Sequence, residues 1–368
     1  MKPQRVIALL GRRDEPTDAV EEYCRHLGMA LVAHDIELEI RRVPWNQHGW
    51  PASLEALSLQ AGTWRGIWVL VQYTALSWSA RGFPRRLRKV LRVLRRAGAR
   101  VAMVFHDAEP FAGTRFIDRL RRNLQIRSMH EAAARADRVV FTVPPDHLSW
   151  HPVISKKQTF IPVGANLPFS FVPQNHDELH APPAIAVFGI TGGAAGDRET
   201  RDIVAAVRHA CQQLGNLRLL VFGRHAELRA QALKEGLRDA PVELHVEGVI
   251  EDQALLNRFA QSDVLLFVRG TISSRRGSAI AGIACGMPVI ALQGSETSSP
   301  ITDAGVLLVS GELNEAALQQ RLGTSMIRIL ADRDFRLQLA QRSREAQEKY
   351  FSWLAIASSY SSFLRAQD

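Results

Sequence analysis

The chain has 368 residues, which is enough for two domains of ordinary size, each with its own core. Its three cysteines have no metal-binding or redox spacing, and no stretch approaches the roughly 20 apolar residues of a membrane-spanning helix. The first ten residues read as a strand, since their apolar run is too short for a signal peptide. These features exclude a disulfide scaffold and an integral membrane protein, and they predict a cytoplasmic protein in a reducing compartment.

The charge is distributed unevenly. Residues 1–170 hold 26 Lys and Arg against 15 Asp and Glu, a net +11, whereas residues 171–368 hold 20 against 22, a net −2. The basic character therefore belongs to the first half alone, and we expect that half to face an anionic partner or surface.

Strand and helix patterns alternate through the first half. Apolar or alternating runs predict strands, and apolar residues at spacings of three and four predict the helices between them. The predicted strands are residues 6–10, 35–40, 66–71, 101–105 and 138–141, with helices from Asp18 and from Arg115.

Residues 81–100 carry nine Lys or Arg and no acidic residue. Leu87, Val90, Leu91 and Leu94 form one apolar face of a helix, and the cations cover the rest. The helix is either a solvated element on a parallel sheet or a surface for an anionic membrane leaflet, where each cation contributes about 1 kcal/mol. Because no nucleic-acid-binding motif is present, we expect the membrane rather than nucleic acid.

A histidine and two acids follow the strand 101–105. His106, Asp107 and Glu109 come where that strand ends. Ligands of open α/β sheets bind outside the carboxyl ends of the strands, so these three residues are candidates for a site. A lone histidine is more often structural, which is the alternative for His106.

A second alternating region begins after a polar, Pro-rich linker at residues 173–183. It opens with a strand, 184–190, a loop with three glycines, 191–196, and a helix from Asp202. Glycines between a strand and a helix can cradle a phosphate. Further strands are predicted at residues 217–223, 242–248, 263–268 and 289–292, and amphipathic helices at 315–330 and 334–349.

Residues 273–290 read as loop, helix, turn and strand. Ser278 is a suitable N-cap for a helix of small residues, which Cys285 and Gly286 close. Arg275 and Arg276 stand directly before this helix. Two guanidinium groups beside a helix N-terminus predict a phosphate or diphosphate site, and an ordinary βα turn is the alternative.

This stretch resembles the donor-binding core of GT-B glycosyltransferases, in particular the family-four retaining group. Ala284-Cys285-Gly286 through Ile290 matches that group's Ala-Cys-Gly-x-Pro-Val-Ile closely. The resemblance implies an α/β protein with two doubly wound Rossmann-like domains that face each other across a cleft. The expected parts are an acceptor-side domain at 1–172, the linker at 173–183, a nucleotide-sugar-binding domain at 184–350 and a C-terminal helix, 351–368, that crosses back to the first domain.

The chain departs from the family at residues that bind the donor. The paired glutamates of the group fall near Ser273 and at Ala281, and its Arg and Lys fall near Ile190 and Ala195, so all four are missing. We expect Arg275 and Arg276 to supply the displaced positive charge.

The resemblance also implies site residues. His106, Asp107 and Glu109 are the catalytic candidates. The donor-binding candidates lie in the loops after the strands of both domains: Gly11, Gly192, Gly193, Arg224, Ile250, Ser274, Arg275, Arg276, Gly277, Ser278, Glu296 and Thr297.

The function that follows is transfer of a hexose-type sugar from a nucleoside diphosphate sugar to an acceptor hydroxyl, retaining and independent of metal or other cofactors. The basic helix would bring the enzyme to a glycan or lipid-linked acceptor on the inner face of a membrane, as in polysaccharide or glycolipid assembly. Two alternatives stay open. One is a GT-B partner subunit without catalytic activity, which the missing residues favour, and the other is a nucleotide-sugar epimerase.

Overall fold

The computed structural model describes residues 3–15, 17–111, 113, 115–152, 157–165, 167 and 178–366. The chain divides into two compact units, which we call unit 1 (residues 1–163 and 353–368) and unit 2 (residues 164–352). The division falls between Val163 and Gly164, ahead of the expected linker at 173–183. Residues 173–177 of that linker lie outside the described residues.

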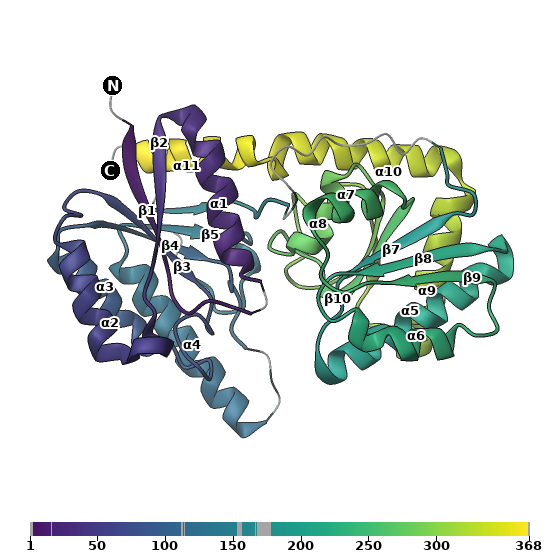
Figure 1. Ribbon diagram of the computed structural model, residues 1–368, viewed down its shortest axis with the longest axis horizontal. Coiled ribbons are helices and arrows are strands. Elements are labelled where there is room, and N and C mark those ends of the chain that lie inside the picture. The colour runs from purple at the N-terminus through teal and green to yellow at the C-terminus, as the bar shows by residue number, and fades with distance from the viewer. Residues whose placement is uncertain are drawn as a thin grey trace. The chain divides into compact units, whose positions relative to one another are not determined.

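Unit 1 is built on a six-stranded sheet in which every pairing is parallel. The strand order is β2-β1-β3-β4-β5-β6 (Figure 1). Its strands are β1 (Gln4–Leu10), β2 (Ile36–Arg42), β3 (Trp68–Tyr73), β4 (Arg100–Phe105), β5 (Arg138–Phe141) and β6 (Gln158–Phe160). The order reverses between β1 and β3, so the loops after these two strands lead to opposite sides and leave a crevice between them.

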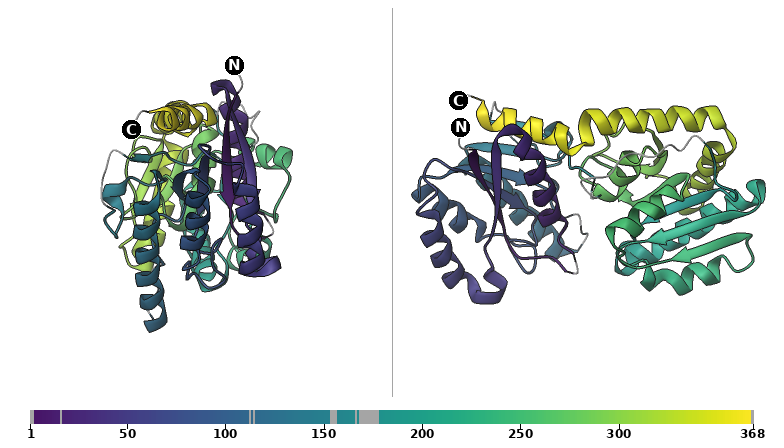
Figure 2. Two further views of the ribbon diagram at one scale, coloured as in Figure 1. Left: turned by 90° about the vertical axis from the view of Figure 1, so that its left-hand side faces the viewer. Right: turned by 45° about the horizontal axis from the view of Figure 1, so that its top comes forward.

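Helices cover both faces of this sheet because its strands are apolar on both sides. One face packs against α2 (Trp45–Ala61), α3 (Leu87–Arg96) and α4 (Phe116–Arg135). The other face carries α1 (Ala19–Leu31) and the C-terminal helix α11 (Trp353–Arg365), which lie side by side (Figures 1 and 2).

Helix α11 is fixed to the rest of unit 1 by buried polar contacts. The Trp68 indole donates to the carbonyl of Leu364 at 3.2 Å, and the hydroxyls of Tyr23 and Tyr360 lie 3.0 Å apart in the core. The last helix of the chain therefore completes the hydrophobic cover over the sheet of the first unit.

Unit 2 repeats the architecture, again with parallel pairings throughout. The strand order is β12-β11-β10-β7-β8-β9, which reverses between β10 and β7. Its strands are β7 (Ala184–Phe188), β8 (Leu217–Phe222), β9 (Val242–Val246), β10 (Val264–Thr271), β11 (Val289–Gln293) and β12 (Val306–Ser310).

The helices of unit 2 also form two layers (Figure 1). Helices α5 (Gly193–Leu214), α6 (Ala230–Gly236) and α9 (Glu315–Ala331) pack on one face of the sheet. Helices α7 (Asp252–Ala260) and α8 (Gly277–Ala284) pack on the other, where Phe259 meets Phe188 and Phe222. Helix α10 (Arg333–Ala346) ends in a π-helical turn, Gln347–Phe351, just before α11.

The predicted fold class is confirmed, and most predicted elements lie within a few residues of their observed bounds. Two predicted helix starts are wrong. Helix α5 begins at Gly193 rather than Asp202, because the glycine-rich run forms its first turn. The N-cap of α8 is Arg276 rather than Ser278, which lies inside the helix. Helices α2 and α6 and strands β6 and β12 were not predicted; α2 contains Gly49 and Pro51, which break the helical pattern.

No helix in the described part of the chain combines the length and apolar content that crossing a bilayer requires.

We predict that Tyr360→Phe lowers the free energy of unfolding of unit 1 by about 1–3 kcal/mol, because it leaves the buried Tyr23 hydroxyl without its partner. The double variant Tyr23→Phe/Tyr360→Phe should recover part of this loss. All seven tryptophans lie in unit 1, so their fluorescence during urea unfolding reports this unit alone.

Tyr73→Phe is the matched control. The Tyr73 hydroxyl is buried and has no hydrogen-bond partner among the described residues, so its removal should be neutral or stabilising. Equal losses for Tyr360→Phe and Tyr73→Phe would show that the hydroxyl pair does not hold α11 in place.

Candidate functional site

A cavity of about 230 Å³ lies in unit 1 where the strand order reverses. Its walls come from the loop after β1, the first turn of α1, the end of β3 and the loop after it, and Asp107 after β4. The lining residues are Leu10, Gly11, Arg12, Asp14, Asp18, Ala19, Val20, Gln72, Thr74, Leu76, Ser77 and Asp107. The cavity thus combines carboxylates and hydroxyls with several aliphatic side chains, a mixture suited to a polar molecule with apolar faces such as a sugar ring.

The loop after β1 is held by close backbone packing. A Cβ on Gly11 would lie only 2.1 Å from the carbonyl oxygen of Ser77, so no side chain fits there. The same carbonyl accepts hydrogen bonds from the Arg12 amide and the Trp45 indole, both at 2.8 Å. This contact brings the loops after β1 and β3 together at the cavity.

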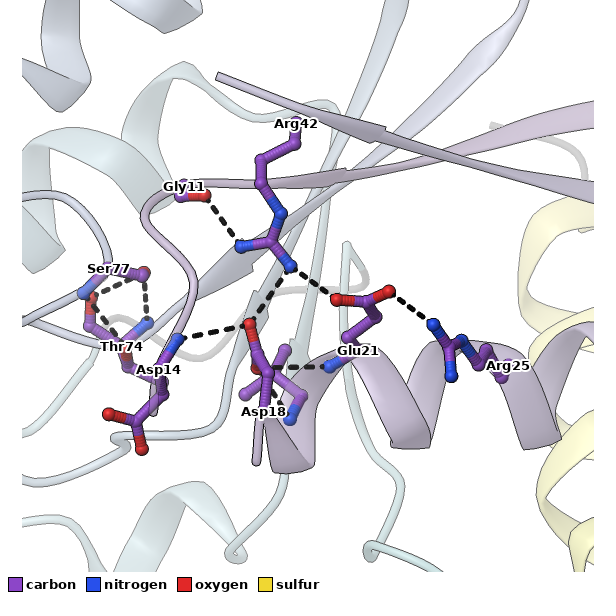
Figure 3. Close-up of polar contacts among 9 residues, drawn as sticks. Gly11, Asp14, Asp18, Glu21, Arg25, Arg42, Thr74 and Ser77 are labelled. Carbon is purple, nitrogen blue, oxygen red and sulfur yellow. Dashed lines mark hydrogen bonds and ion pairs between the residues drawn. The ribbon is translucent and has the colours of Figure 1, made fainter. Parts of the chain in front are cut away.

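Arg42 and Asp18 fix the other end of this loop (Figure 3). Asp18 is the N-cap of α1 and accepts from the amides of Val20 and Glu21, each at 3.2 Å. The Arg42 guanidinium donates to Asp18, to Glu21 and to the carbonyl of Gly11 at 2.8–2.9 Å. Because its charge is shared between two carboxylates, Arg42 acts as a clamp on the loop.

His106 lies directly after β4, and its ring meets Tyr23 edge to face at 4.8 Å. Its Nε2 is 2.7 Å from Oε1 of Gln72, while the Gln72 amide nitrogen donates to the Leu70 carbonyl. That orientation of Gln72 makes Nε2 of His106 the protonated nitrogen and leaves Nδ1 with a lone pair. Burial lowers the pKa of His106 to about 4, against a weak opposing effect of Asp18, so the ring is neutral at pH 7.

The two acids near His106 have different surroundings. Asp107 lines the cavity and accepts from the Ala75 amide at 2.9 Å. Glu109 is turned toward Ser149, where its carboxylate accepts from both the amide and the hydroxyl. Of the three catalytic candidates, Asp107 alone belongs to the cavity lining, together with the donor candidate Gly11.

In unit 2 the candidate loops also lie where the strand order reverses, between β7 and β10. The loop after β7 runs from Gly189 to Gly192, which is the N-cap of α5 and provides no side-chain cap. The first amide groups of α5 are therefore open to a ligand, as at other helix N-termini that bind anions. Gly196 permits this arrangement, because a Cβ there would lie 1.9 Å from the carbonyl oxygen of Thr191.

Arg269 lies against this loop and was missed by the sequence analysis. A Cβ on Gly189 would be 2.8 Å from Nη1 of Arg269. Burial lowers the pKa of Arg269; the Glu199 carboxylate opposes that shift and the Arg224 charge adds to it. Arg269 has no hydrogen bond and no ion pair with any other residue that the structure describes. A desolvated cation without a carboxylate partner, at the crevice of a doubly wound sheet, is a candidate anion-binding residue.

Two predicted donor-binding residues, Arg275 and Glu296, form a bidentate ion pair with both N–O distances at 2.7 Å. Burial raises the pKa of Glu296, but the hydrogen bonds and charge of Arg275 outweigh it and hold the pKa below its usual value. The neighbouring Thr297 is a loop residue whose hydroxyl donates to the carbonyl of Ile272 and accepts from the amide of Gly294. Much of the Arg275 charge is therefore neutralised within the protein.

The remaining donor candidates lie at the ends of β8, β9 and β10. Arg276 is close to Gly270, where a Cβ would be 3.7 Å from Nη2, and it precedes Gly277 and Ser278 in the first turn of α8. Ser274 is buried beside it. The carbonyl of Arg224 accepts from the Ile190 amide, which joins the loops after β7 and β8. Ile250 is half-buried after β9, just before α7.

Among the described residues, no three His, Cys, Asp or Glu side chains lie close enough together to hold a metal ion.

No family model matches the sequence, and no curated protein matches it either. Solved structures do match over the whole chain. A glycosyltransferase from Rickettsia africae has a TM-score of 0.69 at 13% identity and covers 100% of both chains. Anabaena HepE, solved with UDP and glucose, has a TM-score of 0.65 at 13% identity and covers 98% of this chain and 99% of its own.

MurG from Acinetobacter baumannii has a TM-score of 0.54 at 11% identity and covers 97% of this chain and 99% of its own. At these identities the likeness concerns the fold. The chain has the GT-B fold, with two doubly wound, Rossmann-like units.

We predict that unit 1 becomes less stable as the pH falls from about 6.5 to 4. In this range His106 binds a proton in the unfolded chain, whereas in the folded chain its pKa of about 4 keeps it neutral. Over this pH range the free energy of unfolding of the variant His106→Gln should fall by about 3 kcal/mol less than that of the wild type. Urea unfolding followed by tryptophan fluorescence measures the difference.

His48→Gln is the control, because His48 is exposed in the same unit and its side chain forms no hydrogen bond or ion pair with another described residue. It should retain the pH dependence of the wild type. If His106→Gln showed the wild-type slope as well, His106 would not be the imidazole that stays neutral in the folded protein.

Proposed function

We propose that the chain is a glycosyltransferase that transfers a sugar from a UDP-sugar to an acceptor hydroxyl. The observation that carries the proposal is Arg269, a half-buried guanidinium without an ion-pair partner among the described residues, beside the loop that starts α5. On a GT-B fold, unit 2 offers this cation and the open amides of α5 where a leaving diphosphate needs positive charge. The choice of UDP rests on the ligands of HepE, which is similar in fold.

In the proposed step one bond forms and one bond breaks. The acceptor oxygen forms a bond to the anomeric carbon on the face from which the diphosphate departs, the bond from that carbon to the diphosphate oxygen breaks, and the diphosphate leaves with the electron pair. Arg269 and the first amides of α5 stabilise the charge that develops on the diphosphate. Arg276 is the second candidate cation, since it stands at the start of α8. Retention at the anomeric carbon and independence of metal are parts of this proposal.

The cavity of unit 1 is the proposed acceptor site. Asp107 lines it and offers a carboxylate to the acceptor hydroxyl, which would orient that group and accept its proton. His106 does not line the cavity; it is neutral and bonded to Gln72, which does, so we assign it the positioning of the Gln72 amide. Glu109 is held by Ser149, and we assign it no part in the step.

The acceptor is proposed to be attached to a lipid at a membrane surface. The support is the exposed cationic face of α3 in residues 81–100, which would bring the cavity of unit 1 to an anionic leaflet. Polysaccharide or glycolipid assembly is the process in which such an acceptor occurs.

A partner subunit without catalytic activity is the second candidate. The Arg275–Glu296 ion pair favours it, because Arg275 is one of the two arginines expected at the diphosphate and is already bound to a carboxylate of the protein. The two candidates differ in turnover, because a subunit of this kind would bind or ignore the donor but would not consume it.

We predict that the purified protein binds UDP in a calorimetric titration without added metal, in preference to GDP, ADP and dTDP. Arg269→Ala should weaken this binding by about tenfold to a hundredfold, the value of charged hydrogen bonds of about 1.5–3 kcal/mol. The affinity of Arg269→Lys for UDP should lie between those of the wild type and Arg269→Ala, because lysine keeps the charge but lacks the planar guanidinium group.

Arg333→Ala is the control, because Arg333 is an exposed arginine of unit 2 at the start of α10. It should bind UDP like the wild type. Unchanged affinity in Arg269→Ala would contradict the diphosphate site. UDP binding without release of UDP from any UDP-sugar, in the presence of lipid-linked acceptors, would instead support the partner subunit.

A further inference from the structure

Strand β12 lies at one edge of the unit 2 sheet and has no charged side chain. The two sheets end in four edge strands, which are β2, β6, β9 and β12. Natural edge strands avoid pairing with other chains by being short or by carrying charges, prolines or bulges. Strands β2 and β9 carry charged side chains, and β6 has only three residues. The sequence of β12 is Val-Leu-Leu-Val-Ser, and its register with β11 is continuous, so it has none of these features.

The backbone of β12 offers hydrogen-bonding groups along this edge. The carbonyl of Gly305 accepts from the first residue of β11 at 2.9 Å, and the amide of Gly311 donates to the last residue of β11 at 3.2 Å. The odd-numbered residues of this segment are therefore the ones that bond to β11. Because the backbone groups of successive residues in a strand point in opposite directions, those of Leu308 and Ser310 point to the edge. Leu308 is half-buried and Ser310 is exposed, so an added strand can reach them.

A groove of about 400 Å³ lies between the edge of β12 and helix α9. The side chains of Leu307 and Val309 pack in the core layer beneath α9, so the groove lies on the α9 face of the sheet. On the helix side, residues three and four positions apart share the face that lines the groove. These residues are Arg321, Thr324, Ser325 and Arg328.

The charge of the groove is positive. Arg321 and Arg328 are the only charged side chains among the described residues that line it. Both are exposed, and neither side chain forms a hydrogen bond or ion pair with another described residue. The guanidinium of Arg328 lies over the ring of Phe335 at 3.8 Å, which fixes its position. The groove therefore favours an occupant with acidic side chains.

The spacing of the two arginines fits a strand. Seven helical residues separate Arg321 from Arg328, a rise of about 10 Å. A strand added to β12 would present every second side chain to the α9 face, at intervals of about 7 Å. Acidic residues two or four positions apart in such a strand would each lie within reach of one arginine.

We propose that the edge of β12 binds an extended segment of a partner protein, which adds to the sheet as a further strand and presents acidic side chains to Arg321 and Arg328. In this mode of recognition the backbone hydrogen bonds supply affinity, and the alternating side chains supply specificity. The proposed contact goes beyond sugar transfer and depends on neither the donor nor the acceptor.

The same charges disfavour a second copy of this chain as the occupant. Two copies that paired through their β12 edges about a two-fold axis would form one continuous sheet, with both α9 helices on the same face. Arg321 and Arg328 would then lie close to their equivalents, and the described residues that line the groove include no carboxylate to compensate them. An acidic strand from another protein is attracted by these arginines instead.

Fluorescence anisotropy of labelled peptides with the full chain tests the proposal. The probe is Thr-Glu-Val-Glu-Val-Glu-Thr, which places glutamates on one face of a strand and valines on the other. It should bind saturably, and high salt should weaken the binding because it screens exposed charges. The peptide with lysine in place of each glutamate should bind about tenfold or more weakly.

Two N-methylated forms of the probe test the backbone pairing. One form is methylated at the glutamate amides and the other at the valine amides. In a paired strand, alternate amides point toward the neighbouring strand and away from it. One form should therefore lose binding, and the other should keep it.

Variants of the chain locate the contact. Leu308→Pro removes an amide that points to the edge but leaves the bonds to β11, and edge strands tolerate proline, so it should abolish binding of the probe. Arg321→Glu/Arg328→Glu should weaken binding of the probe about tenfold or more and should favour the lysine peptide. Arg238→Glu/Arg333→Glu is the matched control, because it changes two exposed arginines elsewhere in unit 2 and should bind like the wild type. Thermal unfolding followed by circular dichroism checks the fold of each variant.

Three results would overturn the proposal. The first is the absence of saturable binding of the probe. The second is equal affinity for the glutamate and lysine peptides, or unchanged binding in Leu308→Pro. The third is a wild-type dimer in sedimentation that Leu308→Pro converts to a monomer, which would show that a second copy occupies the edge. The UDP titration is a separate measurement, so failure of the donor site leaves this test intact.

Discussion

Each sheet of this protein reverses its strand order once, and at both reversals a glycine allows a close backbone contact that a side chain would prevent. In unit 1 the contact is Gly11 against the carbonyl of Ser77, where a Cβ would be 2.1 Å away. In unit 2 it is Gly196 against the carbonyl of Thr191, at 1.9 Å. The cavity of unit 1 depends on the first contact, which joins the loops after β1 and β3, and the first turn of α5 depends on the second, which lies within one segment of the chain.

The arginines around these loops divide into two kinds. Arg42 and Arg275 bind carboxylates in close geometry, and each holds a loop in place. Arg269 has lost part of its hydration and forms no ion pair with a described carboxylate; the charge of Glu199 offsets only part of the effect of burial. The cost of keeping such a cation uncompensated is recovered when an anion binds, so the same side chain that weakens the empty protein strengthens the complex. This is the physical reason to assign the donor diphosphate to Arg269 rather than to Arg275.

The sequence predicted the two-unit α/β architecture because strands buried on both faces are continuous apolar runs that alternate with helices. It also predicted the loops that carry the candidate residues. It could not show which arginine is uncompensated, since Arg269 reads as part of a strand and Glu296 lies 21 residues from its partner Arg275. The early start of α5 was hidden by glycines whose cost in a helix is offset by close packing.

The positive charges of the two units act over different ranges. The cations of α3 are exposed, so each attracts a surface of opposite charge from a distance of about one Debye length and loses that attraction in salt. Arg269 is desolvated, so its field is strong, short in range and only weakly screened. The first kind suits a contact that must form and break on a broad surface, and the second suits one phosphate group in one geometry. The function proposed above uses both kinds, and the net positive charge of residues 1–170 lies in the half of the chain to which we do not assign the donor.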